Sequence, residues 1–208
     1  MKKPFLGVYN PSIILTYLGV FFSVTGMAIL FSTERADASE NMKWVLILLV
    51  LAGICDMFDG LVARRCKRTE KEKQFGIQLD SLADTVSFVA FPACILLFMC
   101  GLDVAGIIIA FFYIFAGIMR LGWFNVTTEE NKGVYQGMPV TFSSAFFPLA
   151  HVIVKLFSLN YQALVFKIVC SAVGLLFILN FKLKKPRIVG TVVFAILALV
   201  ALVALIVL

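Results

Sequence analysis

Residues 44–62 read WVLILLVLAGICDMFDGLV, an apolar run in which Asp56 and Asp59 are the only charged residues. A helix of this length can cross the hydrocarbon core of a bilayer, which takes about 20 apolar residues. The run therefore predicts a membrane-spanning helix. It also predicts a functional site, because a carboxylate at membrane depth is costly unless it is paired or bound to a cation.

The whole chain has the composition of a membrane protein. Of its 208 residues, 62% are hydrophobic and 14% are charged, so too few polar residues remain to cover a water-soluble surface. We therefore predict one domain, residues 1–208, with an all-α fold: a polytopic bundle of membrane helices. Seven runs are apolar and long enough to span a membrane, namely 11–31, 44–62, 81–100, 104–124, 140–158, 162–181 and 188–208.

The Lys and Arg residues are divided unevenly between the two sides of this predicted bundle. Fourteen of the 18 lie at the N-terminus and in the regions 64–79, 120–139 and 182–187. Because basic residues favour the cytoplasmic side, we expect the N-terminus and the 64–79 loop in the cytoplasm and the C-terminus outside. The same rule accounts for the net charge of +6 without a nucleic-acid partner. Residues 1–10 are expected to form a short interfacial helix.

Four aspartates form two pairs with helical spacing. Asp56 and Asp59 are three residues apart in the second span, and Asp80 and Asp84 are four apart at the start of the third. Such residues share a helix face, and a short loop would make the two helices antiparallel neighbours. Converging carboxylates repel one another unless cations lie among them, and oxygen ligands favour Mg²⁺ or Mn²⁺. We predict two such ions, although the pairs alone would also fit a divalent-cation transporter.

Small residues and an arginine accompany the aspartates. Gly60 and Ala63 lie one turn apart beside the acidic face of the second span, and Gly76 lies one turn before Asp80. Gaps at these positions would let a bulky ligand approach the helix backbone. Arg64 falls at the predicted edge of the membrane, where a guanidinium can bind phosphate.

The full string from Asp56 to Asp84 resembles the motif of the CDP-alcohol phosphotransferase family, DxxDGxxAR…GxxxDxxxD, at every fixed position. The resemblance implies a six-helix core over residues 11–186, a polar cavity open to the cytoplasm and a homodimer, with 188–208 as an extra helix. It also implies that all four aspartates bind metal and that Asp84 is the general base. The residues it implies for contact with the CDP moiety are Asp56, Asp59, Gly60, Ala63, Arg64, Gly76 and Asp80.

Further stretches are similar to the phosphatidylserine synthases of this family. They are LDSLADTVSF at 79–88, RLGWFNV at 120–126 and YQGMPV at 135–140. This similarity implies CDP-diacylglycerol as the lipid donor and L-serine as the acceptor. The sequence departs from the pattern at Gly122, Trp123 and Thr141, where Ala, Arg and Pro are usual.

The acceptor leaves alternatives open. Glycerol 3-phosphate or inositol phosphate would need two or more extra cations, and the fourth to sixth spans offer few beyond Arg120, because Lys155 and Lys167 map to the far side. This favours serine. An ether-lipid donor is a further alternative. The candidates for holding serine or the lipid phosphate are Arg120, Asn125 and Gln136.

Overall fold

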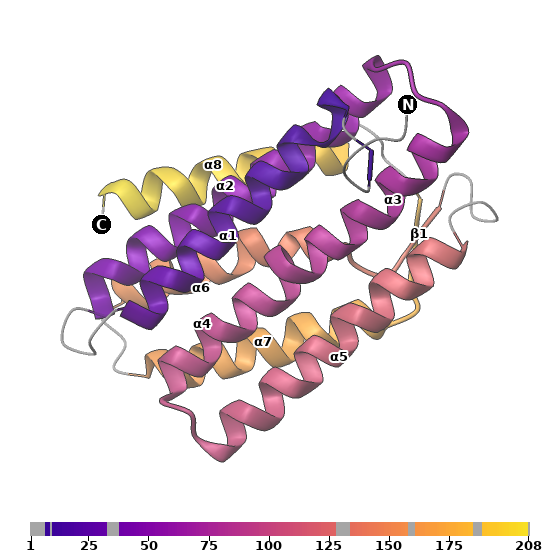
Figure 1. Cartoon of the computed structure of the whole chain (residues 1–208). Helices are drawn as coiled ribbons and strands as arrows, with labels where there is room; N and C mark the ends of the chain where they lie inside the picture. Colours follow the sequence, from indigo (N-terminus) through magenta and orange to yellow (C-terminus); the bar gives the residue numbers. More distant parts are fainter. Residues whose placement is uncertain are drawn as a thin grey trace.

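Helices make up nearly all of the chain that the structure, a computed structural model, describes: residues 7–8, 10–32, 38–127, 134–157, 161–184 and 189–207. The all-α prediction is thus confirmed, and the interfacial helix predicted at 1–10 falls mostly on residues outside this part. Two short strands pair in antiparallel fashion. The elements are α1 (Ile14–Ser32), α2 (Ala38–Arg65), α3 (Glu70–Asp84), α4 (Phe91–Cys100), α5 (Val104–Thr127), β1 (Val134–Gln136), α6 (Ser143–Leu156), α7 (Gln162–Ile178), β2 (Lys182–Lys184) and α8 (Val189–Val207) (Figure 1).

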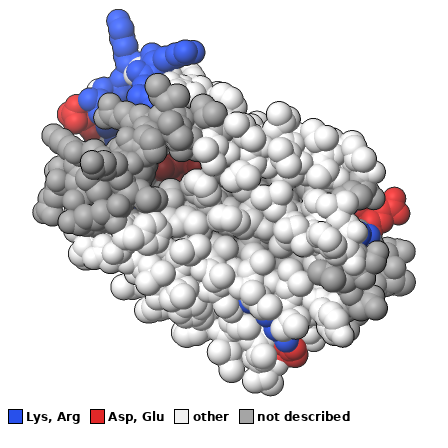
Figure 2. Space-filling model, turned by 180° about the vertical axis from the view of Figure 1, so that it is seen from behind, with Lys and Arg blue, Asp and Glu red and all other residues white. Residues whose placement is uncertain are grey.

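Apolar helices lie at all seven predicted spans. Four are long and apolar enough to cross a bilayer, at Ile14–Ser32, Glu40–Arg65, Glu70–Cys100 and Val104–Thr127. The last three spans correspond to shorter apolar helices. On the face shown in Figure 2, charged side chains gather at the two ends of the molecule, and a broad uncharged surface separates them. The chain is a multi-pass membrane protein.

The third helix begins earlier than the sequence predicts. The expected loop at 64–79 is wrong from Glu70 onward, because α3 begins there and the turn after α2 covers only residues 66–69. Thr69 caps the helix: its hydroxyl accepts from the Glu72 N–H at 3.3 Å, and the Glu72 carboxylate accepts from the Thr69 N–H at 2.8 Å. This reciprocal capping box starts the helix well before the apolar run.

A π-helical turn, η3 (Thr85–Ala90), joins α3 to α4. Pro92 has no N–H to donate to the Phe88 carbonyl four residues earlier, so the regular helical ladder is broken there. The Tyr113 hydroxyl on α5 donates to this carbonyl at 2.8 Å, and the Ser143 hydroxyl at the start of α6 donates to it at 3.2 Å. Because the hydrocarbon layer offers no water, these bonds satisfy the carbonyl and tie η3 to two neighbouring helices.

The last helix, α8, packs one face on α2 and α6. Ala198, Ala201 and Leu205 are buried there, and small residues allow the helices to approach closely. Lys43, near the start of α2, donates from Nζ to the Ile206 carbonyl at 3.1 Å, which satisfies one of the last carbonyls of α8. The sequence analysis expected residues 188–208 to form an extra helix, and the structure shows that the other face of this helix is exposed.

Replacing Tyr113 by Phe removes one of the two donors to the Phe88 carbonyl without changing the packed ring. We expect the free energy of unfolding in detergent to fall by about 1 kcal/mol, the usual net contribution of a buried hydrogen bond. Tyr161→Phe is the control. Because Tyr161 is 70% exposed, loss of its hydroxyl should leave the free energy of unfolding unchanged. Equal unfolding midpoints for Tyr113→Phe and the unmodified chain would contradict this role.

Candidate active site

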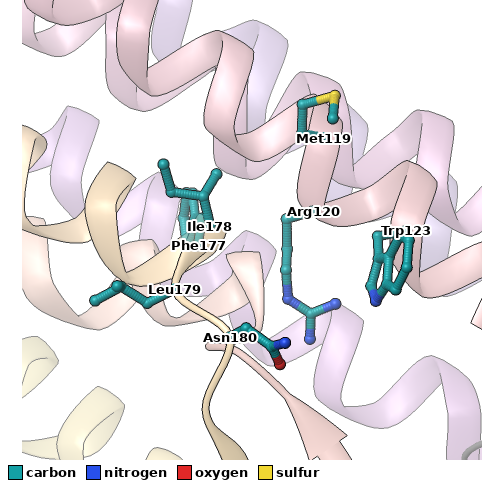
Figure 3. A pocket seen from close by; sticks show the side chains of 7 residues that line it. All are labelled: Met119, Arg120, Trp123, Phe177, Ile178, Leu179 and Asn180. Carbon is teal, nitrogen blue, oxygen red and sulfur yellow. The ribbon is translucent and has the colours of Figure 1, made fainter.

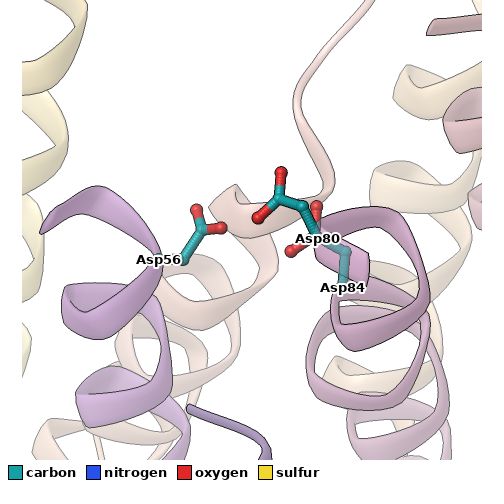
Figure 4. Close-up of side chains that lie close together, drawn as sticks. All are labelled: Asp56, Asp80 and Asp84. Atoms are coloured by element: carbon teal, nitrogen blue, oxygen red, sulfur yellow. The ribbon is translucent and has the colours of Figure 1, made fainter. Parts of the chain in front are cut away.

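The two predicted aspartate pairs face each other from α2 and α3. One carboxylate oxygen from each of Asp56, Asp80 and Asp84 lies within 4.8 Å of the others (Figure 4). Asp59 is 9% exposed and lies beside them. The carboxyl groups lie close to one another across the two helices, Asp56 near Asp84 and Asp59 near Asp80. The convergence predicted from spacing is therefore confirmed.

Two threonines from other helices orient the pair on α2. The Thr16 hydroxyl on α1 donates to Asp59 Oδ2 at 3.0 Å, and the Thr141 hydroxyl, before α6, donates to Asp56 Oδ2 at 2.9 Å. Sequence reasoning missed Thr16, and it noted Thr141 only as a departure from a family pattern. The structure gives Thr141 a specific contact that a proline could not make.

An open cavity of about 240 Å³ lies over the carboxylates. Arg120 lies in its wall together with the acidic groups, and this residue is only 7% exposed. The remaining wall comes from α5 and from the segment before α6. The residues that line the cavity are Asp56, Asp59, Asp80, Asp84, Arg120, Leu121, Phe124, Pro139, Val140 and Thr141.

The donor set fits a hard divalent cation. Within the described residues, none of the four carboxylates has a Lys or Arg nitrogen within 4.0 Å. Among the residues that the structure describes, the side chains that meet here offer carboxylate and hydroxyl oxygens, and no sulfur or imidazole ligand joins them. Oxygen ligands of this kind select Mg²⁺ or Mn²⁺ over softer metals. Asp56, Asp80 and Asp84 could hold such an ion, with Asp59 beside them.

The glycines of the motif lie under arginine side chains, one at the end of α2 and one from the turn that follows it. A Cβ added at Gly60 would lie 3.5 Å from Nη1 of Arg64, and one added at Gly76 would lie 3.4 Å from Nη1 of Arg68. Arg68 was not singled out by the sequence. Its Nε is buried and has no hydrogen-bond partner in the described part of the chain. The half-buried Ala63 and the exposed Arg64 do not line the cavity itself.

The three acceptor candidates have different surroundings. Arg120 donates from Nε to the Met138 carbonyl at 3.1 Å, and its guanidinium carbon lies 5.5 Å from the centre of the Phe124 ring. Asn125 lies outside the cavity wall, where its Oδ1 accepts from the Ser81 hydroxyl at 2.9 Å. Gln136 lies in β1, but its side chain is outside the described part of the structure.

Gly137 makes the position of Arg120 possible. Its φ is +70°, which favours glycine, and an added Cβ would lie 3.2 Å from the carbonyls of Phe177 and Leu179 and 3.3 Å from Nε of Arg120. The Gly137 N–H donates to the Phe181 carbonyl at 2.9 Å. The segment between β1 and α6 is thus held against the end of α7 and presents the Met138 carbonyl to Arg120.

Comparison with known proteins agrees with this arrangement. The sequence pattern of the CDP-alcohol phosphatidyltransferase family matches residues 9–207. The chain belongs to this family. The predicted family is therefore confirmed, and the match also covers the last helix, α8, which the sequence analysis placed beyond the core.

Among relatives in the CDP-alcohol phosphatidyltransferase family, an archaetidylserine synthase of Methanothermobacter thermautotrophicus is 33% identical over 84% of this chain and 65% of its own length. A CDP-diacylglycerol–serine O-phosphatidyltransferase of Helicobacter pylori (strain J99) is 35% identical over 52% of this chain and 43% of its own length. The enzyme of that name from Bacillus subtilis is 29% identical over 71% of this chain and 77% of its own length. The chain thus spans less than two thirds of the first two relatives. No solved structure matches it significantly.

Replacing Thr141 by Val should weaken divalent-ion binding by about tenfold, because groups that orient a metal ligand typically contribute tenfold to 100-fold in affinity. Titration with Mn²⁺, following the free ion by electron paramagnetic resonance, measures the change. Thr25→Val is the matched control: the Thr25 hydroxyl bonds only within its own helix, to the Phe21 carbonyl, on an exposed surface. Unchanged Mn²⁺ affinity in Thr141→Val would show that this hydroxyl does not support a metal site.

Proposed function

We propose that this chain transfers a phosphatidyl group from CDP-diacylglycerol to L-serine and releases CMP. The observation that carries this proposal is the set of four carboxylates that converge from α2 and α3 at membrane depth with no Lys or Arg partner among the described residues. The names of the relatives support the choice of donor and acceptor. Membership of the family counts against a cation transporter, the alternative from another class.

The aspartates would hold divalent ions. When bound, such ions neutralise the charge on the diphosphate of the donor and on the departing CMP. Thr16 and Thr141 fix Asp59 and Asp56, so these two carboxylates are oriented before any ligand arrives. At Gly60 and Gly76 only the flexible side chains of Arg64 and Arg68 lie over the backbone of α2 and α3, so a nucleotide that displaces them would find a place beside the carboxylates.

Asp84 is our proposed general base. Among the described residues, Asp56 and Asp59 each accept a threonine hydroxyl, whereas no hydroxyl donates to Asp80 or Asp84, and the family motif favours Asp84 of these two. Asp84 would accept the proton of the serine hydroxyl while the serine oxygen forms a bond to the β-phosphorus. The bond from that phosphorus to the CMP oxygen breaks, and CMP leaves with the electron pair.

The cavity supports an acceptor that carries no phosphate. Arg120 is the only cation among the described residues that line it. A second phosphate on glycerol 3-phosphate or inositol phosphate would need further cations, and Lys167 is engaged at the far end of the bundle with Asp103. One guanidinium matches one carboxylate, so Arg120 could hold serine by its carboxylate or the donor by its phosphate. The linkage of the lipid chains, ester or ether, stays open in this proposal.

The membrane orientation follows from the position of the basic residues. Arg65, Lys67 and Lys71 lie at the end of the bundle where α2 meets α3, which is also the end nearer the aspartates. By the positive-inside rule we propose that this end faces the cytoplasm, where serine is available, and that the protein lies in the cytoplasmic membrane. A homodimer is also part of the proposal, by analogy with the family.

The activity test uses purified protein with Mn²⁺ or Mg²⁺, CDP-diacylglycerol and a panel of alcohols, and it measures CMP release. We expect release with L-serine, and a loss of at least about 100-fold in Asp84→Asn, the lower range for removing a general base. Asp103→Asn is the control, because Asp103 lies at the opposite end of the bundle. Release of CMP with another alcohol but not with serine would assign a different acceptor. Near-normal rates in Asp84→Asn would show that Asp84 is not the general base.

Removing divalent ions should abolish the reaction. We expect a chelator to stop CMP release completely, and added Mn²⁺ or Mg²⁺ to restore it, because carboxylates alone cannot neutralise a diphosphate. Direct titration should count two Mn²⁺ ions per chain in the presence of CMP. A single ion per chain would contradict the two-ion site, and turnover in chelator would contradict the metal site altogether.

A further inference from the structure

A second cavity, which no aspartate among the described residues lines, also borders Arg120. It has a volume of about 220 Å³ and lies between the ends of α5 and α7 (Figure 3). In the described part of the chain, Arg120 is the residue that lines both cavities. The other lining residues are Met119, Trp123, Phe177, Ile178, Leu179 and Asn180.

The wall of this cavity continues into the lipid-facing surface. Met119 is 54% exposed and Trp123 is 58% exposed, and both lie on the side of α5 that also exposes Phe115 and other apolar residues nearer the start of the helix. Leu179, at the end of α7, is exposed as well. A tryptophan in such a position is typical of the boundary between hydrocarbon and headgroups. The cavity therefore opens sideways at the level where a lipid headgroup joins its chains.

The residues that line this cavity suit the part of a lipid near its ester linkage. Hydrocarbon side chains provide most of the wall, while Arg120, Asn180 and the Trp123 indole provide polar groups. A cavity of about 220 Å³ is smaller than the roughly 300–1,000 Å³ of sites that enclose a whole small molecule, so it would take only part of a ligand. Free serine fits poorly, because none of the described lining residues has a carboxylate to balance its ammonium group.

We propose that this second cavity receives the beginning of one hydrocarbon chain of the lipid donor, together with its link to glycerol. The proposal rests on the proposed function, because it requires the diphosphate of the same lipid to lie over the aspartates. Arg120 separates the two cavities, so its guanidinium faces the junction of phosphate and glycerol when each part of the lipid occupies its own cavity. Lipid enters between α5 and α7 without leaving the bilayer.

A binding test can use the two tryptophans of the chain, Trp44 and Trp123. Trp123 lines the cavity, whereas Trp44 is 54% exposed near the start of α2, at the other end of the bundle. In Trp44→Phe protein, Trp123 is the only tryptophan, and CDP-diacylglycerol brominated near the ester end should quench it saturably. Unbrominated CDP-diacylglycerol should reverse the quenching. Trp123→Phe protein, which keeps Trp44, is the matched control and should show no saturable quenching.

Brominated phosphatidylcholine provides the comparison that could overturn the proposal. If phosphatidylcholine brominated at the same position quenches Trp123 as strongly and at the same mole fraction, the cavity holds surrounding lipid only. Bromines near the methyl end of the chain should quench less than bromines near the ester, and the reverse order would also contradict the proposal. This measurement needs no turnover. It therefore tests the cavity even if the chain releases no CMP with serine, a result that would overturn the proposed function instead.

A kinetic test fills the cavity. Met119→Trp should lower the preference for a dioleoyl over a diacetyl CDP-lipid, measured as the ratio of kcat/KM, by about tenfold, the effect of losing about two buried methylenes. The KM for serine should not change. Phe115→Trp, one turn away on the exposed face of α5, is the control and should leave the ratio unaltered. An unchanged ratio in Met119→Trp would overturn the proposal, and a raised KM for serine alone would assign the cavity to the acceptor.

Discussion

Repulsion among the carboxylates of α2 and α3 is the constraint that the rest of this structure has to accommodate. Two unit charges about 4 Å apart near a protein surface repel by roughly 4 kcal/mol, and here three carboxylates lie within 4.8 Å of one another. Only bound cations or protons remove that repulsion. The relative position of α2 and α3 is therefore linked to ligand chemistry, and Thr16 and Thr141 stabilise it from neighbouring elements.

Two departures from regular helical backbone border this site, and hydrogen bonds to neighbouring elements stabilise both. The π-helical turn follows Asp84 directly, and the Phe88 carbonyl within it, which Pro92 cannot serve as a donor, accepts from Tyr113 and Ser143. The left-handed Gly137 places the segment before α6 against the end of α7. In lipid such departures from helical geometry persist only where other groups replace the missing hydrogen bonds. They fix the walls of the cavity that contains Arg120.

The sequence predicts the parts of this site that depend on local periodicity. Hydropathy locates the spans, and the spacing of Asp56, Asp59, Asp80 and Asp84 places each pair on one helix face. The contacts it does not predict join residues far apart in the chain: Thr141 lies 85 residues from the aspartate it contacts. No single-sequence pattern encodes such a contact. The early start of α3 is a different case, because its capping box is local and polar, and hydropathy alone does not detect it.

Depth in the membrane explains how one site can serve a lipid and a water-soluble alcohol. Asp59 lies six residues before the end of α2 at Arg65, which corresponds to about 9 Å of helix. The headgroup layer on each side of a bilayer is only slightly thinner, about 5–8 Å, since the full membrane exceeds its hydrocarbon core by about 10–15 Å over both sides. The aspartates would therefore lie near the level of lipid phosphates, with water on one side and chains on the other. The two cavities that meet at Arg120 have the polarity that such a boundary requires.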